Sequence, residues 1–564
     1  MMYIREKIEA QIKDLIHTAV ENAIKAQDFS LESLPEIYLE IPREKEHGDY
    51  ATNIAMQLPK QAHKAPRFIA ESIIKHIDIN GSYVDDVSIA GPGFINFKLI
   101  KNWSYESLLE IAEMKDDYGK TKGNAGKKYN LEFISANPTG PMHMGNARGG
   151  AIGDILASIA EWTGYDVTRE FYVNDAGNQI AKFGDSLDVR FLQLMGEDVS
   201  FPEDGYQGDD IRVHMEEFID REGGSAVCIQ YMAMEPDERK EIFVKYALEK
   251  NLKKMHKDLE KYGVEYDIWF SEQSLYDSGA VESALKILCD KGAVYEKEGA
   301  IWFATSEFGC EKDDVLVRNN GLPTYFMGDI AYHLNKFIDR GFDRCINVWG
   351  ADHHGHIARL KAAMEAAGVD PDHLEIVIMQ LVRLMRDGEI ARMSKRKGEM
   401  ITLTDLIDEV GVDAARFFFN LRSPDSHLDF DLDLAIEESN DNPVFYVQYA
   451  HARICSILRQ MSGDINKELP ANLTLLKEKE EFTLLEMLSN FPQELIIAES
   501  KMDPSRVTRY AIDLASAFHS FYSACRVRVD DMELMKARLL LIESTKQVLK
   551  NVLGVLGINA PERM

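Results

Sequence analysis

The residues best suited to chemistry lie between Glu132 and Asn146, in the run EFISANPTGPMHMGN. The pattern predicts a strand over 129–134, a turn at the prolines and glycine, and a helix that begins near His143. A glycine-rich helix start offers free N–H groups and a positive dipole end, which suit a phosphate. Gly145 allows a nucleotide to approach the backbone, and His143 can donate to phosphate oxygens. Alternatively, His143 packs on the helix cap and the glycines serve contact between helix and sheet.

A second segment, residues 392–398 with the sequence RMSKRKG, concentrates positive charge in a predicted loop. Its centre is Met393, Ser394 and Lys395. When a nucleoside triphosphate forms an adenylate, negative charge moves onto the pyrophosphate. Cations aimed at that charge stabilise the transition state more than the ground state. The alternative is a solvated basic turn, which is what most charge runs are.

A third segment ends a predicted strand with Gly350, Ala351, Asp352 and His353, followed by His354 and His356. Three histidines and an aspartate could hold a metal ion. However, neighbouring side chains at a strand end point to different sides, and the sequence offers no second cluster of ligands. The six cysteines are scattered and form no Cys-x-x-Cys pair. We therefore expect no protein-bound metal, zinc included, and no disulfide framework.

In this order, the first two segments resemble the two signature sequences of class I aminoacyl-tRNA synthetases, and their surroundings resemble the arginyl-tRNA synthetase branch. The resemblance implies a reaction of an amino acid with ATP, accompanied by Mg²⁺, and then with tRNA. It implies catalytic roles for His143, Asn146 and Lys395, and ATP contacts by His143, Gly145, Asn146, Gly350, Asp352, His353, Met393, Ser394 and Lys395. At Asn146 the family usually has a second histidine; an amide there can still donate to phosphate but carries no charge.

The amino-acid pocket decides which substrate such a fold accepts. A guanidinium is planar, permanently charged and carries five donors, so its pocket needs carboxylates and a fixed acceptor. Tyr325 and Asp329 are four residues apart, which places them on one face if the segment is helical. The resemblance implies that Glu132, Tyr325 and Asp329 surround the guanidinium of arginine, while Asn137 and Gln380 hold its α-amino end. Local pairing of Glu132 and core packing of Tyr325 are the alternatives.

The length of 564 residues predicts about three domains. We expect a multidomain α/β protein with an N-terminal α+β domain over 1–115, which the resemblance places at the outer corner of tRNA. A Rossmann-like catalytic domain follows over 116–430, because strand and helix signals alternate there, and a helical insertion interrupts it at about 196–298. Only helical patterns follow over 431–564. The resemblance implies that this last part is an all-α anticodon-binding bundle.

Aromatic residues in both flanking domains are candidates for contact with tRNA. On the N-terminal strand, Phe94, Asn96 and Phe97 could stack on and hydrogen-bond an exposed loop base. In the C-terminal bundle, aromatics interleaved with arginine suit unstacked anticodon bases. The candidates there are Tyr446, Tyr449, Phe518, Phe521, Tyr522 and Arg526. For each aromatic the alternative is the core of its own domain.

The net charge of −30 does not by itself favour a nucleic-acid partner, because phosphate contacts dominate such affinity. The distribution of charge matters more than the sum, and the region from Arg506 onward is mildly basic. No apolar run approaches 18 residues and the N-terminus lacks an apolar signal core, so we expect a cytoplasmic protein without membrane contact. Separately, we expect a monomer.

The function that follows from the resemblance is ligation of arginine to tRNA(Arg), with ATP as co-substrate. A cysteinyl enzyme shares the helical domain type, but it would need zinc-ligating cysteines. A stand-alone nucleotidylyltransferase would explain both signatures and not the flanking domains. A catalytically silent relative that only binds tRNA has Asn146 as its sole support.

Overall fold

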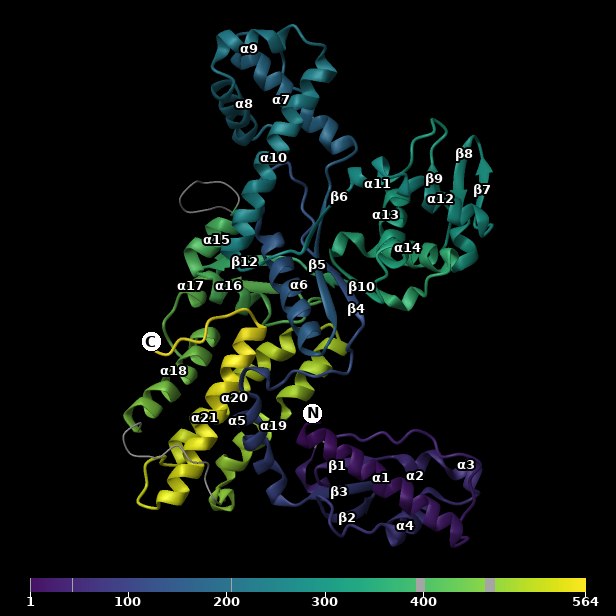
Figure 1. Cartoon of the computed structure of the whole chain (residues 1–564), viewed down its shortest axis with the longest axis vertical. Coiled ribbons are helices and arrows are strands. Elements are labelled where there is room, and N and C mark those ends of the chain that lie inside the picture. The colour runs from purple at the N-terminus through teal and green to yellow at the C-terminus, as the bar shows by residue number, and fades with distance from the viewer. Residues whose placement is uncertain (1, 43, 204, 392–400, 462–471) are drawn as a thin grey trace.

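The computed structural model describes residues 2–42, 44–203, 205–391, 401–461 and 472–564. Figure 1 shows a central sheet with a helical bundle packed below it, a small N-terminal domain beside the bundle, and a helical extension at the opposite end. The predicted multidomain α/β architecture, with a Rossmann-like core and an all-α C-terminal part, is confirmed. Within the described residues, no helix is both long and apolar enough to cross a membrane.

The N-terminal domain packs helices on a three-stranded antiparallel sheet of order β1-β3-β2. Helix α1 buries an isoleucine at every fourth position from Ile4 to Ile16, which gives the sheet an apolar cover. The turn at residues 91–93 folds β2 and β3 into an antiparallel hairpin. The elements are α1 (Ile4–Lys25), β1 (Tyr50–Thr52), α2 (Ile54–Gln57), α3 (Pro59–Ala62), α4 (Pro66–His76), β2 (Val84–Ala90) and β3 (Phe94–Leu99).

The catalytic core is a five-stranded parallel sheet of order β11-β10-β4-β5-β6. Its strands are β4 (Lys128–Glu132), β5 (Asp166–Val173), β6 (Ile268–Ser271), β10 (Arg344–Gly350) and β11 (Leu374–Met379). The chain builds outward from β4 to β6 and then returns to place β10 on the other side of β4. Ligands of open parallel sheets bind at the carboxyl ends of the strands, at such a reversal of strand order.

Helix α6 (Met144–Trp162) follows β4 and packs closely against the sheet. A Cβ atom added at Gly153 would stand 2.2 Å from the ring of Phe133, so only glycine permits this packing. A Cβ atom at Gly150 would meet Ile134 at 3.0 Å. The later glycines of α6 therefore serve contact between helix and sheet, which leaves Gly145 as the glycine at the helix start.

Two additions interrupt the sheet. The first is helical and lies between β5 and β6: α7 (Asn178–Leu194), α8 (Asp209–Arg221), α9 (Ser225–Met232) and α10 (Pro236–Tyr262). Strand β6 lies inside the range 196–298 expected for the insertion, yet it pairs with β5 in the main sheet. The second addition precedes β10 and comprises α11 (Gln273–Asp277), α12 (Ala280–Asp290), β7 (Val294–Lys297), β8 (Ala300–Phe303), β9 (Asp314–Val317) and α13 (Tyr325–Leu334).

The C-terminal bundle shares one hydrophobic core with the catalytic domain. Arg416 joins the two, because its wholly buried guanidinium donates to Asp154 of α6 at 2.5 Å and to the carbonyls of Gly263 and Leu556 at 3.1 Å each. The remaining elements are α5 (Tyr105–Met114), α14 (His354–Ala367), β12 (Val382–Arg386), β13 (Glu389–Ile390), α15 (Leu403–Val410), α16 (Val412–Phe419), β14 (Leu428–Asp431), α17 (Leu432–Ala435), α18 (Pro443–Met461), α19 (Lys479–Ser500), α20 (Ser505–Ala524) and α21 (Met532–Val555).

Candidate active site

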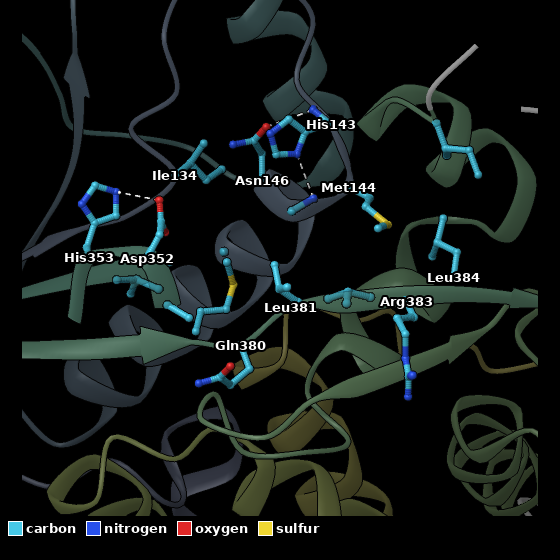
Figure 2. A pocket seen from close by; sticks show the side chains of 18 of the residues that line it. Ile134, His143, Met144, Asn146, Asp352, His353, Gln380, Leu381, Arg383 and Leu384 are labelled. Carbon is cyan, nitrogen blue, oxygen red and sulfur yellow. Dashed lines mark hydrogen bonds and ion pairs between the residues drawn. The ribbon is translucent and has the colours of Figure 1, made fainter. Parts of the chain in front are cut away.

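A cavity of about 850 Å³ opens where β4, β10 and β11 end and α6 begins. Figure 2 shows polar side chains from these separate elements around it, above an apolar floor that includes Leu381 and Leu384. The structure brings together here all six of the described residues predicted to bind ATP. The predicted site residues that line this cavity are His143, Gly145, Asn146, Gly350, Asp352, His353 and Gln380.

The start of α6 is capped by its own signature residues. The Nδ1 atom of His143 accepts from the backbone N–H of Gly145 at 3.1 Å, and Oδ1 of Asn146 accepts from the backbone N–H of His143 at 2.9 Å. Burial lowers the pKa of His143, which favours a neutral ring at pH 7. Because Nδ1 accepts, the ring proton belongs on Nε2. His143 therefore offers one neutral donor at the positive end of a helix.

The second signature, with Met393, Ser394 and Lys395, lies outside the described residues. The chain that follows it is described and contacts the first signature directly. Leu403 donates its backbone N–H to the carbonyl of Met142 at 2.9 Å, and Thr402 forms an antiparallel bridge with His143. Residues 402 and 403 thus lie beside the first signature, about 260 positions earlier in the sequence.

A second cavity, of about 730 Å³, adjoins the first and shares Asp352 and His353 with it. Tyr325 and Asp329 line this second cavity. They occupy the first two turns of α13, so the helix expected from their spacing is confirmed. Tyr325 is exposed, and the side chain of Asp329 is 37% exposed, so both are accessible to a ligand.

Of the other three residues predicted for the arginine pocket, Glu132 and Asn137 line neither cavity. Glu132 ends β4 and is buried, and its carboxylate pairs with the wholly buried ammonium of Lys336 at 2.8 Å. Asn137 donates from Nδ2 to Oε1 of Gln179 at 2.6 Å. Gln380 lines the first cavity, not the second. Since Lys336 neutralises Glu132 inside the protein, the charge of Glu132 is already balanced before any ligand arrives.

Glu272 is a residue that sequence reasoning missed. It follows β6 at the carboxyl edge of the sheet, and only 5% of it is exposed. Burial, then the nearby carboxylates of Asp329 and Asp175, raise its pKa to about 7. Tyr172 hydrogen-bonds the Glu272 carboxyl. A cation near Glu272 and Asp329 would favour the ionised form of Glu272 and offset this rise in its pKa.

Comparison with known proteins decides the family. Three family models match consecutive parts of the chain: the arginyl tRNA synthetase N terminal domain over residues 6–99, the tRNA synthetases class I (R) catalytic domain over 108–437, and the DALR anticodon binding domain over 447–564. The catalytic model alone spans more than half of the chain. The chain belongs to the arginyl-tRNA synthetase family.

Relatives of this family match the chain from end to end. It is 54% identical over 570 residues to the arginine–tRNA ligase of Acetivibrio thermocellus. It is 55% identical over 567 residues to the arginine–tRNA ligase of Caldanaerobacter subterraneus. Each alignment covers 100% of this chain and 100% of the relative. The arginyl-tRNA synthetase of Thermus thermophilus has the same fold, with a TM-score of 0.73 at 21% identity over 98% of this chain and all of that one. The predicted family resemblance is confirmed.

Burial bears on part of the predicted tRNA surface of this synthetase family member. Phe97 is wholly buried and Asn96 is 5% exposed, because alternate residues of β3 face the core of the N-terminal domain or lie within its sheet. Phe518 and Phe521 are wholly buried in the C-terminal bundle. These side chains fill the cores of their own domains, which favours the alternative interpretation for them, and their contact with tRNA bases stays an untested prediction. Phe94 is half-buried and stays a candidate.

Three of the remaining candidates in the bundle, Tyr446, Tyr449 and Tyr522, lie on α18 and α20 in contact with His519 or Arg453. The ring of His519 lies 4.9 Å from that of Tyr446 and 6.1 Å from that of Tyr449, measured between centroids. Arg453 donates to the hydroxyl of Tyr522 at 3.1 Å, and its guanidinium lies over the same ring. Arg526 is exposed beyond the end of α20.

Proposed function

We propose that this protein is an arginine–tRNA ligase, which activates L-arginine with ATP to arginyl-adenylate and pyrophosphate and then transfers the arginyl group to the 3′ end of tRNA(Arg). The observation that supports this most directly is the pair of adjoining cavities at one edge of the parallel sheet. One has a capped helix start suited to phosphate, and the other has acids suited to a cation.

In this proposal, ATP occupies the first cavity. His143 donates from Nε2 to a phosphate oxygen, and Gly145 lets the phosphates approach the start of α6. Asn146 holds the backbone of His143 in place. Gly350, Asp352 and His353 lie beside the adenosine, with Asp352 and His353 paired at 3.6 Å at the end of β10 (Figure 2).

The charge that develops on pyrophosphate needs cations. Lys395, with Met393 and Ser394, is proposed to supply one from the second signature, and Mg²⁺ accompanies ATP to supply another. The arginine carboxylate then attacks the α-phosphorus and pyrophosphate leaves. The protein contributes chiefly by holding the two reactants in line and by stabilising the leaving charge.

Arginine occupies the second cavity, with its guanidinium between Asp329 and Glu272 and beside the hydroxyl of Tyr325. A guanidinium held by both carboxylates would offset the burial and the charge of Asp329, which together raise the pKa of Glu272. Asn137 and Gln380 are proposed to hold the α-amino end, nearer to ATP, and Glu132 stays a candidate for the guanidinium, with its carboxylate paired to Lys336 in the free protein. Because the cavities share Asp352 and His353, the reacting carboxylate can reach the nucleotide.

Transfer RNA is proposed to contact both flanking domains. The surface cluster of Tyr446, Tyr449, His519, Tyr522 and Arg453 offers rings and a guanidinium on which unstacked anticodon bases can stack. Arg526 adds charge beside it. Phe94 remains the candidate for the outer corner of the tRNA on the N-terminal domain.

The replacement Asp329→Ala tests the pocket. A buried guanidinium that loses a charged acceptor costs several kcal/mol, so the variant should bind arginine at least about 100-fold more weakly, which corresponds to about 2.7 kcal/mol. Affinity for ATP should barely change. Separate calorimetric titrations with arginine and ATP measure both, and Asp372→Ala on an exposed turn is the control. Unchanged arginine affinity, or an equal loss for both ligands, would remove Asp329 from the pocket.

A further inference from the structure

A chain of three polar contacts leads from Asp329 into the wall of the second cavity. The Nε2 atom of His356 lies 2.7 Å from Oδ2 of Asp329, and Nε of Arg359 donates to Nδ1 of His356 at 2.5 Å. Nη1 of Arg359 donates in turn to Oδ1 of Asp314 at 3.1 Å. The chain therefore ties together α13, which carries Asp329, α14, which carries His356 and Arg359, and the start of β9.

The chemistry of arginine determines the state of the imidazole. A guanidinium N–H only donates, so Nδ1 of His356 must accept, and the ring proton must sit on Nε2. The Nε2–H then donates to Oδ2 of Asp329. The ring has little freedom to turn away, because its side chain is only 11% exposed and packs beside Phe326 and Trp349, with centroids 5.4 and 5.6 Å away.

Asp314 balances the charge of Arg359, and the aromatic face of Phe326 lies 4.8 Å from that guanidinium. These contacts hold the Arg359 guanidinium at the wall of the second cavity, where its side chain is 38% exposed. His356 links Arg359 to Asp329, so the guanidinium reaches this oxygen of the carboxylate through the neutral ring. One oxygen of Asp329 is thus held by the protein, and the other remains for a ligand.

We propose that His356 is a positioning residue that orients the carboxylate of Asp329 and so sets the preference of the pocket for a charged guanidinium. Arg359 and Asp314 fix the tautomer and orientation of its ring. This inference rests on the proposed function only in that Asp329 receives the guanidinium. Second-layer hydrogen bonds of this kind orient an acceptor that touches the ligand, as they orient the ligands of metal sites.

Calorimetric titration of the full chain with L-arginine and with ATP tests the proposal. His356→Leu should weaken arginine binding about 10- to 100-fold, the range for a lost hydrogen bond to a charged group, and should leave ATP affinity within about twofold. His356→Gln keeps an N–H that can donate to Asp329 and an oxygen that can accept from Arg359, so it should recover most of the affinity. His354→Leu, at the exposed histidine two positions before, is the matched control and should bind both ligands normally.

The relative affinity of the protein for arginine and for citrulline gives a second measure of the role of His356. L-citrulline has the shape of arginine without its charge, and an oriented carboxylate favours the charged ligand. The affinity ratio of arginine to citrulline should therefore fall in His356→Leu and be restored in His356→Gln. Equal loss of arginine and ATP affinity in His356→Leu would show a merely structural role and overturn the proposal.

A double replacement separates this inference from the proposed function. In the Asp329→Ala background, His356→Leu should lower arginine affinity by less than about a further twofold, because both replacements act through one contact. If Asp329→Ala loses arginine affinity and His356→Leu keeps it, the positioning role of His356 is wrong and the pocket stands. If Asp329→Ala itself binds arginine normally, the proposed pocket fails instead.

Discussion

Glu272 gives the sharpest prediction, because the same carboxyl group should weaken the free protein and strengthen the complex with arginine. Its pKa rises from 4.5 to about 7 in the folded protein. At about 1.4 kcal/mol per pKa unit, that rise corresponds to about 3 kcal/mol. The folded state holds the proton more tightly than the unfolded state, so stability falls as pH rises from 4.5 to 7 and stays low above 7.

The replacement Glu272→Gln removes this cost because the amide cannot ionise. At pH 8 the variant should be more stable than the parent by up to about 3 kcal/mol, and near pH 4.5 the difference should nearly vanish. The catalytic domain has about 330 residues, so this corresponds to a rise of about 4 °C in its Tm at pH 8. The variant should also bind arginine about 100-fold more weakly, since the guanidinium loses one of its two carboxylates.

Thermal melts at pH 8 and pH 4.5, each with and without arginine, measure both effects. The parent should gain stability from arginine at pH 8, and Glu272→Gln should gain little. Glu282→Gln, on the exposed face of α12, controls for the loss of a surface charge. A variant that is no more stable than the parent at pH 8 and binds arginine normally would refute the view that Glu272 lowers the stability of the free protein and binds the guanidinium of arginine.

Two further predictions follow from the site. Arginine affinity in the parent should fall by up to tenfold per pH unit below pH 7, because the cation requires Glu272 ionised. For the same reason, arginine binding at pH 6 should release close to one proton. Titrations in two buffers of different ionisation enthalpy measure this release, and an arginine affinity that does not depend on pH would contradict the prediction. Asn146→His should retain adenylate formation within a few-fold, since a histidine can also accept from the N–H of His143; a collapse of the exchange rate in a folded variant would show that the amide has a role of its own.

The parts of the site that sequence could predict are those encoded by neighbouring residues. His143, Gly145 and Asn146 cap one helix start within four positions, so their geometry follows from the local pattern. Tyr325 and Asp329 share a helix face because four residues make about one turn. The order of strands and helices predicted the parallel sheet, and the carboxyl edge of that sheet then placed Asp352 and Gln380 beside the first signature.

The parts that sequence could not predict depend on distant partners. The pKa of Glu272 is raised by burial and by Asp329, 57 positions later in the sequence. The four-residue strand that precedes Glu272 lies within a segment that the sequence pattern predicted to be helical. Lys336 pairs with Glu132 because α13 continues into a π-helix over Asn335–Asp339 that carries Lys336. The aromatic pattern of the bundle likewise could not separate the buried rings of Phe518 and Phe521 from the exposed ring of Tyr522, because burial is decided by the helices that pack against them.

The most direct test of the proposed function is amino-acid-dependent exchange of pyrophosphate into ATP by the full chain, with each of the twenty amino acids and with and without tRNA. The two cavities predict exchange with arginine and with none of the other nineteen amino acids, because only its planar cation satisfies both Asp329 and Glu272. With tRNA present, arginine should be transferred to the RNA. Exchange with another amino acid, or none with arginine when tRNA is present, would contradict the assignment of this protein as an arginine–tRNA ligase.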